Sequence, residues 1–194
     1  MLVDVSHAAD STALDAIRLS RAPVIASHSS VRALCDVPRN LPDKIIKAIA
    51  ATGGVVQIVA FPTYLKKSSP AEQAERDAAD AAHKQGDMDE PAYLALLDAI
   101  EEKYGAATVD DLIDHVDHVV RLVGVDHVGL SSDFGGGGGI VGWRDARETA
   151  NVTAALSARG YAPADIAKIW GGNLLRTLGR AEAVAKTLQA SKQD

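Results

Sequence analysis

Two short apolar runs near the N-terminus each end in Ser-His, and this repeated pattern constrains the fold more than any other feature of the sequence. The first run covers residues 1–7 and ends at His7, and the second covers residues 23–28 and ends at His28. Short runs rich in valine and isoleucine are typical of buried strands in a parallel sheet. The 21 positions from His7 to His28 leave room for one crossover helix. The two strands are therefore predicted to be neighbours in a right-handed βαβ unit.

The two histidines are candidates for a shared metal site. Neighbouring parallel strands lie about 4.8 Å apart and end at the same edge of the sheet. His7 and His28 are thus expected at a distance at which both can bind one ion, and neutral imidazole is a common metal ligand. Two ligands are too few for a complete site, and each histidine has the alternative of a hydrogen-bonded structural role.

The rest of the chain continues the strand-helix alternation. Further strands are predicted at residues 55–61 and 127–133, and a helix at residues 109–123 has its apolar residues at helical spacing. This order, without hairpin signals, predicts an α/β fold with a parallel sheet, either open and doubly wound or part of a barrel. Residues 66–107 are rich in Ala, Asp and Glu and predict an exposed helical insertion. No glycine fingerprint follows the first strand, which argues against a dinucleotide site.

Three features follow predicted strands, where barrel enzymes carry their functional residues. Asp133 closes the fourth strand and is interpreted either as a loop cap or as a carboxylate acting as ligand or general acid/base. Arg39 is interpreted either as a bidentate clamp for a substrate carboxylate or as a surface residue. The glycine run at residues 135–139 suggests either a phosphate cradle or a flexible lid.

The other histidines are predicted to lack a role in the site. His127 lies six residues before Asp133, which is about 20 Å along a strand, so it belongs at the opposite end. His115 and His118 lie one helical turn apart beside aspartates, and a solvated helix face is favoured over an adventitious metal site. His83 falls in the charged insertion and needs no functional role.

The composition excludes several classes of protein. The 194 residues carry a net charge of -6 without a basic block, so no nucleic acid partner is expected. Cys35 is the single cysteine, which excludes an intrachain disulfide framework and fits a reducing compartment. No apolar run approaches the ~18 residues of a membrane span, and Asp4 interrupts any signal-peptide core. We therefore expect a cytoplasmic protein with no membrane partner.

Six motifs carry a resemblance to a known family. They are Asp4-Val-Ser-His7, Ala22-Pro-Val-Ile-Ala-Ser-His28-Ser, Arg32-Ala-Leu-Cys-Asp36, Arg39-Asn-Leu-Pro-Asp43, Asp126-His-Val-Gly-Leu-Ser-Ser-Asp133-Phe134 and Gly171-Gly-Asn-Leu-Leu-Arg176. In order and content they resemble the membrane (renal) dipeptidase family, which consists of metallopeptidases with an amidohydrolase-like (β/α)8 barrel. The resemblance covers nearly the whole chain and implies a TIM-barrel type of fold.

The resemblance also implies a function and a site. It implies zinc-dependent hydrolysis of dipeptides, or of another amide or a lactam, at a site with two zinc ions. His7 and His28 would ligate one zinc together with a bridging glutamate. Arg39 would bind the free carboxylate of the dipeptide, and Asp133 would handle the proton of the attacking water or the leaving amine. Two metal ions lower the pKa of a bridging water and polarise the scissile carbonyl.

Two departures from the family pattern set the expectation for the chain as a whole. Gly135 follows Asp133-Phe134 where the family usually has a second aspartate, and no His-x-Asp motif precedes His7. The chain thus resembles only the C-terminal half of the barrel, with about four βα units in one domain (residues 1–194). We interpret it as a truncated form, a mis-started gene model or one part of a split protein.

A half barrel is expected to need a partner. Its open strand edges invite pairing with another chain, and its inner face would expose Val3, Val5, Val24 or their neighbours. We expect a homo-oligomer or a complex with a complementary N-terminal half, and little or no dipeptidase activity from the chain alone. The alternative is a non-catalytic remnant or assembly partner that binds metal weakly.

Overall fold

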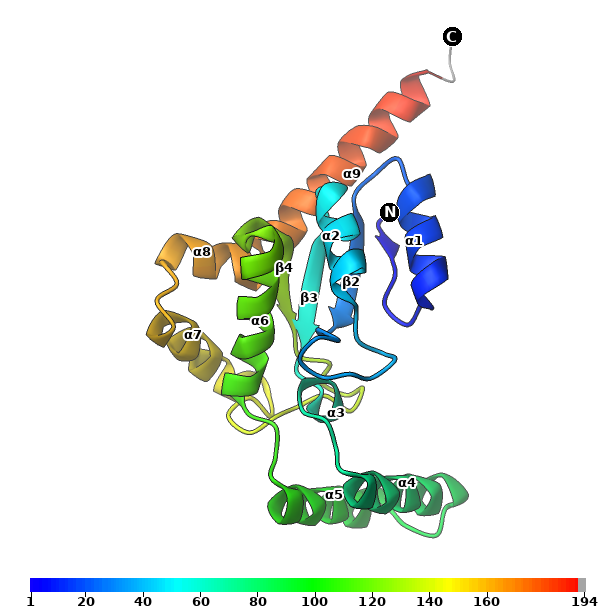
Figure 1. Ribbon diagram of the computed structural model, residues 1–194, viewed down its shortest axis with the longest axis vertical. Coiled ribbons are helices and arrows are strands. Elements are labelled where there is room, and N and C mark those ends of the chain that lie inside the picture. Colours follow the sequence, from blue (N-terminus) through cyan, green and yellow to red (C-terminus); the bar gives the residue numbers. More distant parts are fainter. Residues whose placement is uncertain (192–194) are drawn as a thin grey trace.

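A four-stranded parallel sheet forms the centre of the protein, of which the computed structural model describes residues 1–191 (Figure 1). In spatial order the strands are β1 (Val3–Asp4), β2 (Val24–Ser29), β3 (Val55–Val59) and β4 (Val128–Ser131). Each strand pairs in parallel with the next, which confirms the predicted α/β class, the parallel sheet and the pairing of the first two strands. Strands β1, β3 and β4 are shorter than the apolar runs that predict them, because the ends of those runs leave the ladder and enter loops.

Three helices pack along one face of the sheet and form the main core. They are α1 (Asp10–Leu19), α2 (Asp43–Ala51) and α6 (Val109–Val123). Their apolar residues recur every three or four positions, so one stripe of each helix faces inward. The buried side chains include Ile45, Ile46 and Ile49 of α2 and Leu112, Ile113 and Val116 of α6.

The valines expected on an exposed inner face are mostly buried. Val5 is 2% exposed and Val24 is 0% exposed, whereas Val3 in the edge strand is 38% exposed. The expectation is therefore wrong for Val5 and Val24. Both belong to the hydrophobic core that the helices cover, so their burial needs no partner chain.

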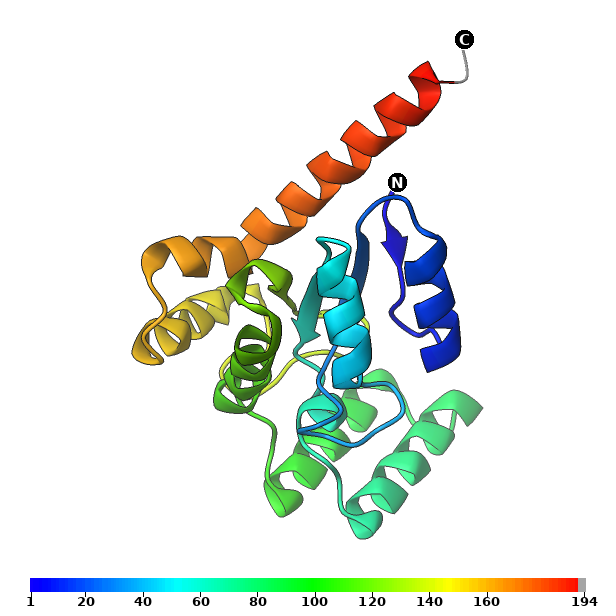
Figure 2. The same ribbon diagram turned by 45° about the horizontal axis from the view of Figure 1, so that its top comes forward.

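Two long helices project beyond the carboxyl ends of the strands (Figures 1 and 2). The two helices are α4 (Pro70–Gln85) and α5 (Glu90–Tyr104), and the short helix α3 (Pro62–Leu65) connects β3 to them. Helices α4 and α5 pack against each other as a hairpin, and each begins at a side-chain cap, Ser69 and Asp89 respectively. Arg144 links the hairpin to the glycine loop after β4 through an ion pair with Glu101, at 2.9 Å.

The chain after β4 returns to the amino ends of the strands. Its helices are α7 (Thr149–Ala158), α8 (Pro163–Ala167) and α9 (Asn173–Ala190), with a 3-10 turn at Ala146–Glu148 and a π turn at Lys168–Gly172. Another 3-10 turn, at Val125–His127, directly precedes β4. Asn173 anchors α9 because its Nδ2 donates to the carbonyls of Val125 and Val128, at 2.7 and 2.9 Å. Beyond this anchor α9 extends away from the sheet (Figure 2). Across residues 1–191, none of the helices is both long and apolar enough to cross a membrane.

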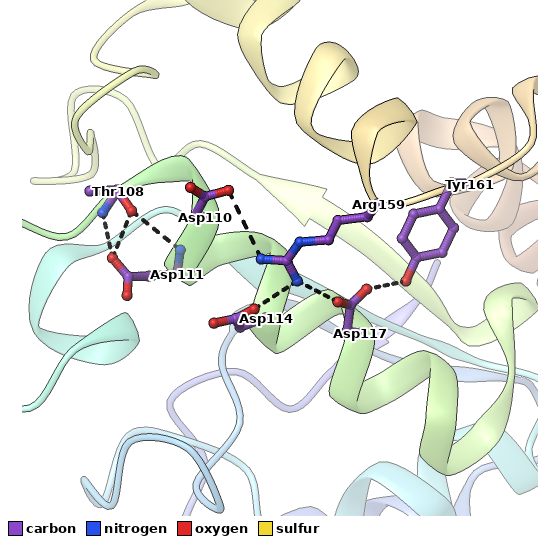
Figure 3. A network of polar contacts seen from close by, with 7 residues as sticks. All are labelled: Thr108, Asp110, Asp111, Asp114, Asp117, Arg159 and Tyr161. Carbon is purple, nitrogen blue, oxygen red and sulfur yellow. Dashed lines mark hydrogen bonds and ion pairs between the residues drawn. The ribbon is translucent and has the colours of Figure 1, made fainter.

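A polar network fixes α6 against the segment between α7 and α8 (Figure 3). Arg159 lies 2.6 Å from Asp117 and 2.7 Å from Asp114, and its guanidinium also approaches Asp110 at 3.9 Å. The hydroxyl of Tyr161 donates to the second oxygen of Asp117, at 2.6 Å. One arginine thus offsets the repulsion among three aspartates on the outer face of α6.

Candidate functional site

The predicted pair of histidines meets at the carboxyl edge of the sheet. His28 lies in β2, His7 lies three residues beyond β1, and their Nε2 atoms are 2.8 Å apart. The ring centroids are 4.8 Å apart, and the ring planes are inclined by 55°. The two Nε2 atoms point toward each other at hydrogen-bonding distance, and a small separation of the rings would let both reach one metal ion.

The backbone at His7 helps to direct this imidazole. His7 has a φ of 66°, in the left-handed region that residues other than glycine rarely adopt. The backbone N–H of Val5 still donates to Ile25 of β2 at 2.9 Å, and a turn then closes with the N–H of Ala8 donating to the carbonyl of Val5 at 3.1 Å. The strained residue is therefore the one that carries the candidate ligand, as is common at functional sites.

Asp133 is the only other non-glycine residue with a positive φ in the described chain, at 54°. It lies two residues beyond β4, and the N–H groups of Gly136 and Gly138 both donate to its carbonyl, at 2.9 and 3.0 Å. A Cβ at Gly136 would lie 2.7 Å from Asp133 Oδ1, and one at Gly138 would lie 2.2 Å from the carbonyl of Ser132. Only glycine fits at position 138, where the clash is with backbone, and a Cβ at position 136 would displace the Asp133 carboxylate. The run wraps around Asp133, and these two amides are engaged within the loop rather than offered to a phosphate.

A β-bulge in β2 sets the direction of His28. The pairing with β3 runs from Ala26↔Val56 to Ser29↔Ile58, so β2 carries one more residue than β3 between these pairs. The bulge brings the consecutive side chains of Ser27 and His28 together, with Ser27 Oγ 2.8 Å from His28 Nδ1. The side chain of Gln57 donates to the carbonyl of Ser27 at 2.9 Å and so satisfies a group that the bulge removes from the ladder.

Asp4 joins β1 to β2 behind His28, a contribution that the sequence analysis missed. Its Oδ1 accepts the backbone N–H groups of Ser6 and Ser27, both at 3.0 Å, and its Oδ2 accepts the hydroxyl of Ser27 at 2.5 Å. Partial burial raises the pKa of Asp4, but these hydrogen bonds outweigh it and hold the pKa below its usual range. The available signal was a charged residue within an apolar strand, because such a group needs partners.

Arg39 lies against the histidines and not on the open surface. Its Nη2 donates to the carbonyl of His28 at 2.7 Å and its Nη1 donates to Ser29 Oγ at 2.9 Å, while the guanidinium lies 5.5 Å from the centroid of the Tyr64 ring. Its Nε is buried and finds no acceptor among residues 1–191. Arg39 and His7 both line a cavity of about 410 Å³, so the arginine has an unused donor near the histidine pair.

The surroundings of His7 favour its neutral form, which is the form that binds metals. Partial desolvation lowers the pKa of His7, and the guanidinium of Arg39 and the neighbouring His28 lower it further. Asp133 and Asp4 act in the opposite direction. Asp133 is thus close enough to His7 to act on it through its charge.

His115 does not lie on a solvated helix face, and that prediction is wrong. It is 1% exposed, its Nδ1 accepts the N–H of Val31 at 3.0 Å, and its Nε2 lies 3.1 Å from the carbonyl of Leu65. The face of α6 that carries His115 packs against α3 and the loop after β2, and local sequence does not reveal such packing. His118 is also partly covered, with Nε2 2.8 Å from Asp43.

The two remaining histidines make structural contacts. His127 lies at the amino end of β4, where its Nδ1 is 2.8 Å from the carbonyl of Gly54. His83 lies in the hairpin, with Nε2 3.1 Å from Glu90 and its ring stacked on Tyr93. Neither joins the pair formed by His7 and His28.

The donor atoms at this edge fit part of a metal site. His7 and His28 supply two convergent ring nitrogens. No group of three or more His, Cys, Asp or Glu side chains in the described part of the chain is placed to hold an ion. The pair therefore supplies two nitrogen donors of the type that zinc binds, and the described residues leave the coordination shell incomplete.

The chain is thus an α/β protein with a four-stranded parallel sheet and two imidazoles paired at its carboxyl edge. Residues 1–192 match the membrane dipeptidase family (peptidase family M19), and the chain belongs to this family. Dipeptidase aclJ of Aspergillus oryzae is 33% identical over 189 residues, which are 97% of this chain and 37% of that protein. Dipeptidase tcpJ of Claviceps purpurea is 34% identical over 186 residues, 95% of this chain and 36% of that protein.

Solved structures show the same likeness. The probable dipeptidase PvdM from Pseudomonas aeruginosa superimposes with a TM-score of 0.79 at 40% identity, over 94% of this chain and 51% of that chain. A metallo peptidase from Rhodobacter sphaeroides, liganded with a phosphinate mimic of the dipeptide L-Ala-D-Ala, superimposes with a TM-score of 0.69 at 26% identity, over 92% and 42%. This chain thus spans about half or less of the length of these relatives.

Proposed function

We propose that this chain carries part of the active site of a zinc-dependent dipeptidase. In this proposal His7 and His28 ligate one zinc ion, Arg39 binds the free carboxylate of the substrate and Asp133 transfers a proton. The observation that carries the proposal is the convergence of the two Nε2 atoms, 2.8 Å apart, at the ends of β1 and β2. A zinc ion held there supplies a Lewis acid for the scissile carbonyl and lowers the pKa of a bound water.

The surroundings of Arg39 support its assignment to the carboxylate. Its contacts with His28 and Ser29 hold the guanidinium in place, and its buried Nε lacks an acceptor within residues 1–191. A carboxylate is the anion that best matches the planar fork of an arginine. The dipeptide mimic bound to the Rhodobacter sphaeroides relative also supports a dipeptide as the substrate.

The loop after β4 supports the assignment of Asp133. The glycine run holds this residue at the carboxyl edge of the sheet, where its charge reaches His7. A carboxylate in this place is suited to take a proton from the attacking water and to return it to the leaving amine.

We also propose that the chain forms about four units of a (β/α)8 barrel and that another polypeptide supplies the missing ligands. The sheet ends at β1 on one side and β4 on the other, and the match to the Pseudomonas aeruginosa structure covers 51% of that chain. The partner would be a complementary N-terminal half or a second copy. The two-ligand set in the described residues favours weak zinc binding and a role as assembly partner for the chain alone.

Zinc affinity tests the metal assignment. We expect His7→Ala and His28→Ala each to weaken zinc binding at least ~10-fold, because each removes one of two ligands. Competition with a chromophoric chelator measures the affinity. His83→Ala is the matched control and should bind zinc as the wild type does. Unchanged affinity in both site variants would refute the assignment.

Substrate comparison tests Arg39. Arg39→Lys should strongly weaken hydrolysis of a dipeptide by the assembled enzyme, because lysine cannot make the planar two-point contact. The matching dipeptide amide lacks the carboxylate and should be affected little. Equal losses of activity for the two substrates would show that Arg39 supports the structure of the site and does not bind the substrate carboxylate.

Light scattering and a hydrolysis assay together test the assembly. The chain alone is expected to associate and to show little or no dipeptidase activity. A monomer that hydrolyses dipeptides at ordinary enzyme rates, about 1–10³ per second, would contradict the half-barrel proposal.

A further inference from the structure

A chain of hydrogen bonds leads from Asp4 through Ser27 to the imidazole of His28. Ser27 Oγ lies 2.5 Å from Asp4 Oδ2 and 2.8 Å from His28 Nδ1. A serine hydroxyl has one hydrogen, so it can donate to only one of these two neighbours. The neighbour that receives the hydrogen decides which ring nitrogen of His28 carries a proton.

The carboxylate of Asp4 is the neighbour that receives it. An ionised carboxylate can only accept, and Oδ1 of Asp4 already accepts the backbone N–H groups of Ser6 and Ser27. The short contact at Oδ2 must therefore use the hydroxyl hydrogen of Ser27. Ser27 Oγ is then an acceptor toward His28, which places the ring proton on Nδ1 and leaves a lone pair on Nε2.

We propose that Asp4, acting through Ser27, is a positioning residue that fixes His28 in the Nδ1-protonated tautomer and so presents Nε2 to a metal ion. The inference rests on the proposed function for the identity of the metal site. The tautomer of His28, however, is a property of the metal-free protein and can be measured without an ion. The backbone of His28 is held as well, because its N–H donates to Ser6 Oγ at 3.0 Å and its carbonyl accepts from Arg39. Such outer-sphere partners commonly fix the tautomer and orientation of a metal-binding histidine.

A purely structural role is the competing explanation, because the same carboxylate clamps β1 to β2. The variant Asp4→Asn separates the two. Its amide oxygen can keep the bonds from the backbone of Ser6 and Ser27, so the clamp persists. Its amide nitrogen donates to Ser27 Oγ, which releases the hydroxyl hydrogen to donate to His28 Nδ1. The ring proton then moves to Nε2 and blocks the ligand atom.

Long-range ¹H–¹⁵N NMR spectra of the metal-free protein distinguish the two tautomers of His28. We expect Nδ1–H in the wild type and Nε2–H in Asp4→Asn, with zinc affinity at least ~10-fold lower in the variant. Ser27→Ala removes the link but keeps the backbone bond to Asp4, and it should lose the preference for Nδ1–H. Ser6→Ala is the control, because it removes a bond to the backbone of His28 and leaves the ring contact intact.

The outcomes separate this inference from the proposed function. A wild-type His28 protonated at Nε2, or an Nδ1–H tautomer retained in both Asp4→Asn and Ser27→Ala, overturns the inference and leaves Asp4 as a strand clamp. If Asp4→Asn does not fold, the spectrum of Ser27→Ala decides. A tautomer that switches as expected in a protein that never binds zinc supports the positioning role and refutes the proposed metal site.

Discussion

Lowering the pH is expected to weaken the fold through His115. The N–H of Val31 donates to its Nδ1, its Nε2–H donates to the carbonyl of Leu65, and the ring is 1% exposed. This arrangement fits only the neutral imidazole, because a second proton on Nδ1 would face the N–H of Val31. Burial lowers the pKa of His115, and the bond to Leu65 opposes burial only in part.

The direction of the effect follows from proton binding. The unfolded chain takes up a proton on this histidine near pH 6.5 and the folded chain does so only at lower pH, so stability falls as the pH falls below about 6.5. One proton changes the free energy of unfolding by at most about 1.4 kcal/mol per pH unit. Between pH 6.5 and pH 5 the loss therefore reaches at most about 2 kcal/mol.

The variant His115→Gln isolates this effect because glutamine does not titrate. Its amide can still reach the carbonyl of Leu65, but the buried N–H of Val31 loses its acceptor, which costs about 1–3 kcal/mol at every pH. At neutral pH the wild type should thus be more stable by that amount. The difference should shrink toward acid pH, because only the wild type has an imidazole at this position to protonate.

Urea unfolding followed by the fluorescence of Trp143 and Trp170 measures both proteins between about pH 7.5 and pH 5. The other ionisable groups are common to the two proteins, so the difference isolates the contribution of residue 115. A difference in the free energy of unfolding that stays constant over this range would refute the reasoning.

Three further predictions concern stability and use the same unfolding assay. Gly54→Ala should lower the free energy of unfolding by at least about 2 kcal/mol, because a Cβ there would lie 1.8 Å from the carbonyl oxygen of Val24. The control Gly179→Ala, in the open interior of α9, should raise it by about 0.5–1 kcal/mol. An unchanged stability of Gly54→Ala would contradict this account of the packing. Asn173→Ala should cost about 2 kcal/mol or more, since two backbone carbonyls lose their donor, and a loss below about 0.5 kcal/mol would show that water replaces it. Arg159→Ala should cost about 1 kcal/mol at low salt and less at high salt; a loss that is independent of salt would mean that packing dominates.

The sequence by itself determined the order of the elements and the meeting of the two histidines. Apolar runs and helical spacing are local signals. They predict strands at residues 23–28, 55–61 and 127–133, each of which overlaps an observed strand, and the buried stripe of α6. The short connection between His7 and His28 allows one helix, so parallel neighbours are the available solution. That pairing places both imidazoles at the carboxyl edge of the sheet, and it can be predicted without knowledge of any tertiary contact.

Only the tertiary structure decided how those residues are oriented and what supports them. The bulge in β2 that joins Ser27 to His28 depends on register with β3, and the contact of Asp4 with Ser27 joins residues 23 positions apart in sequence. His115 looked solvent-exposed by local pattern but is buried, because the α3 segment and the loop after β2 pack over it. A hydrophobic pattern reports which face of an element is apolar, whereas the partner of a polar group depends on which distant backbone the packing places beside it.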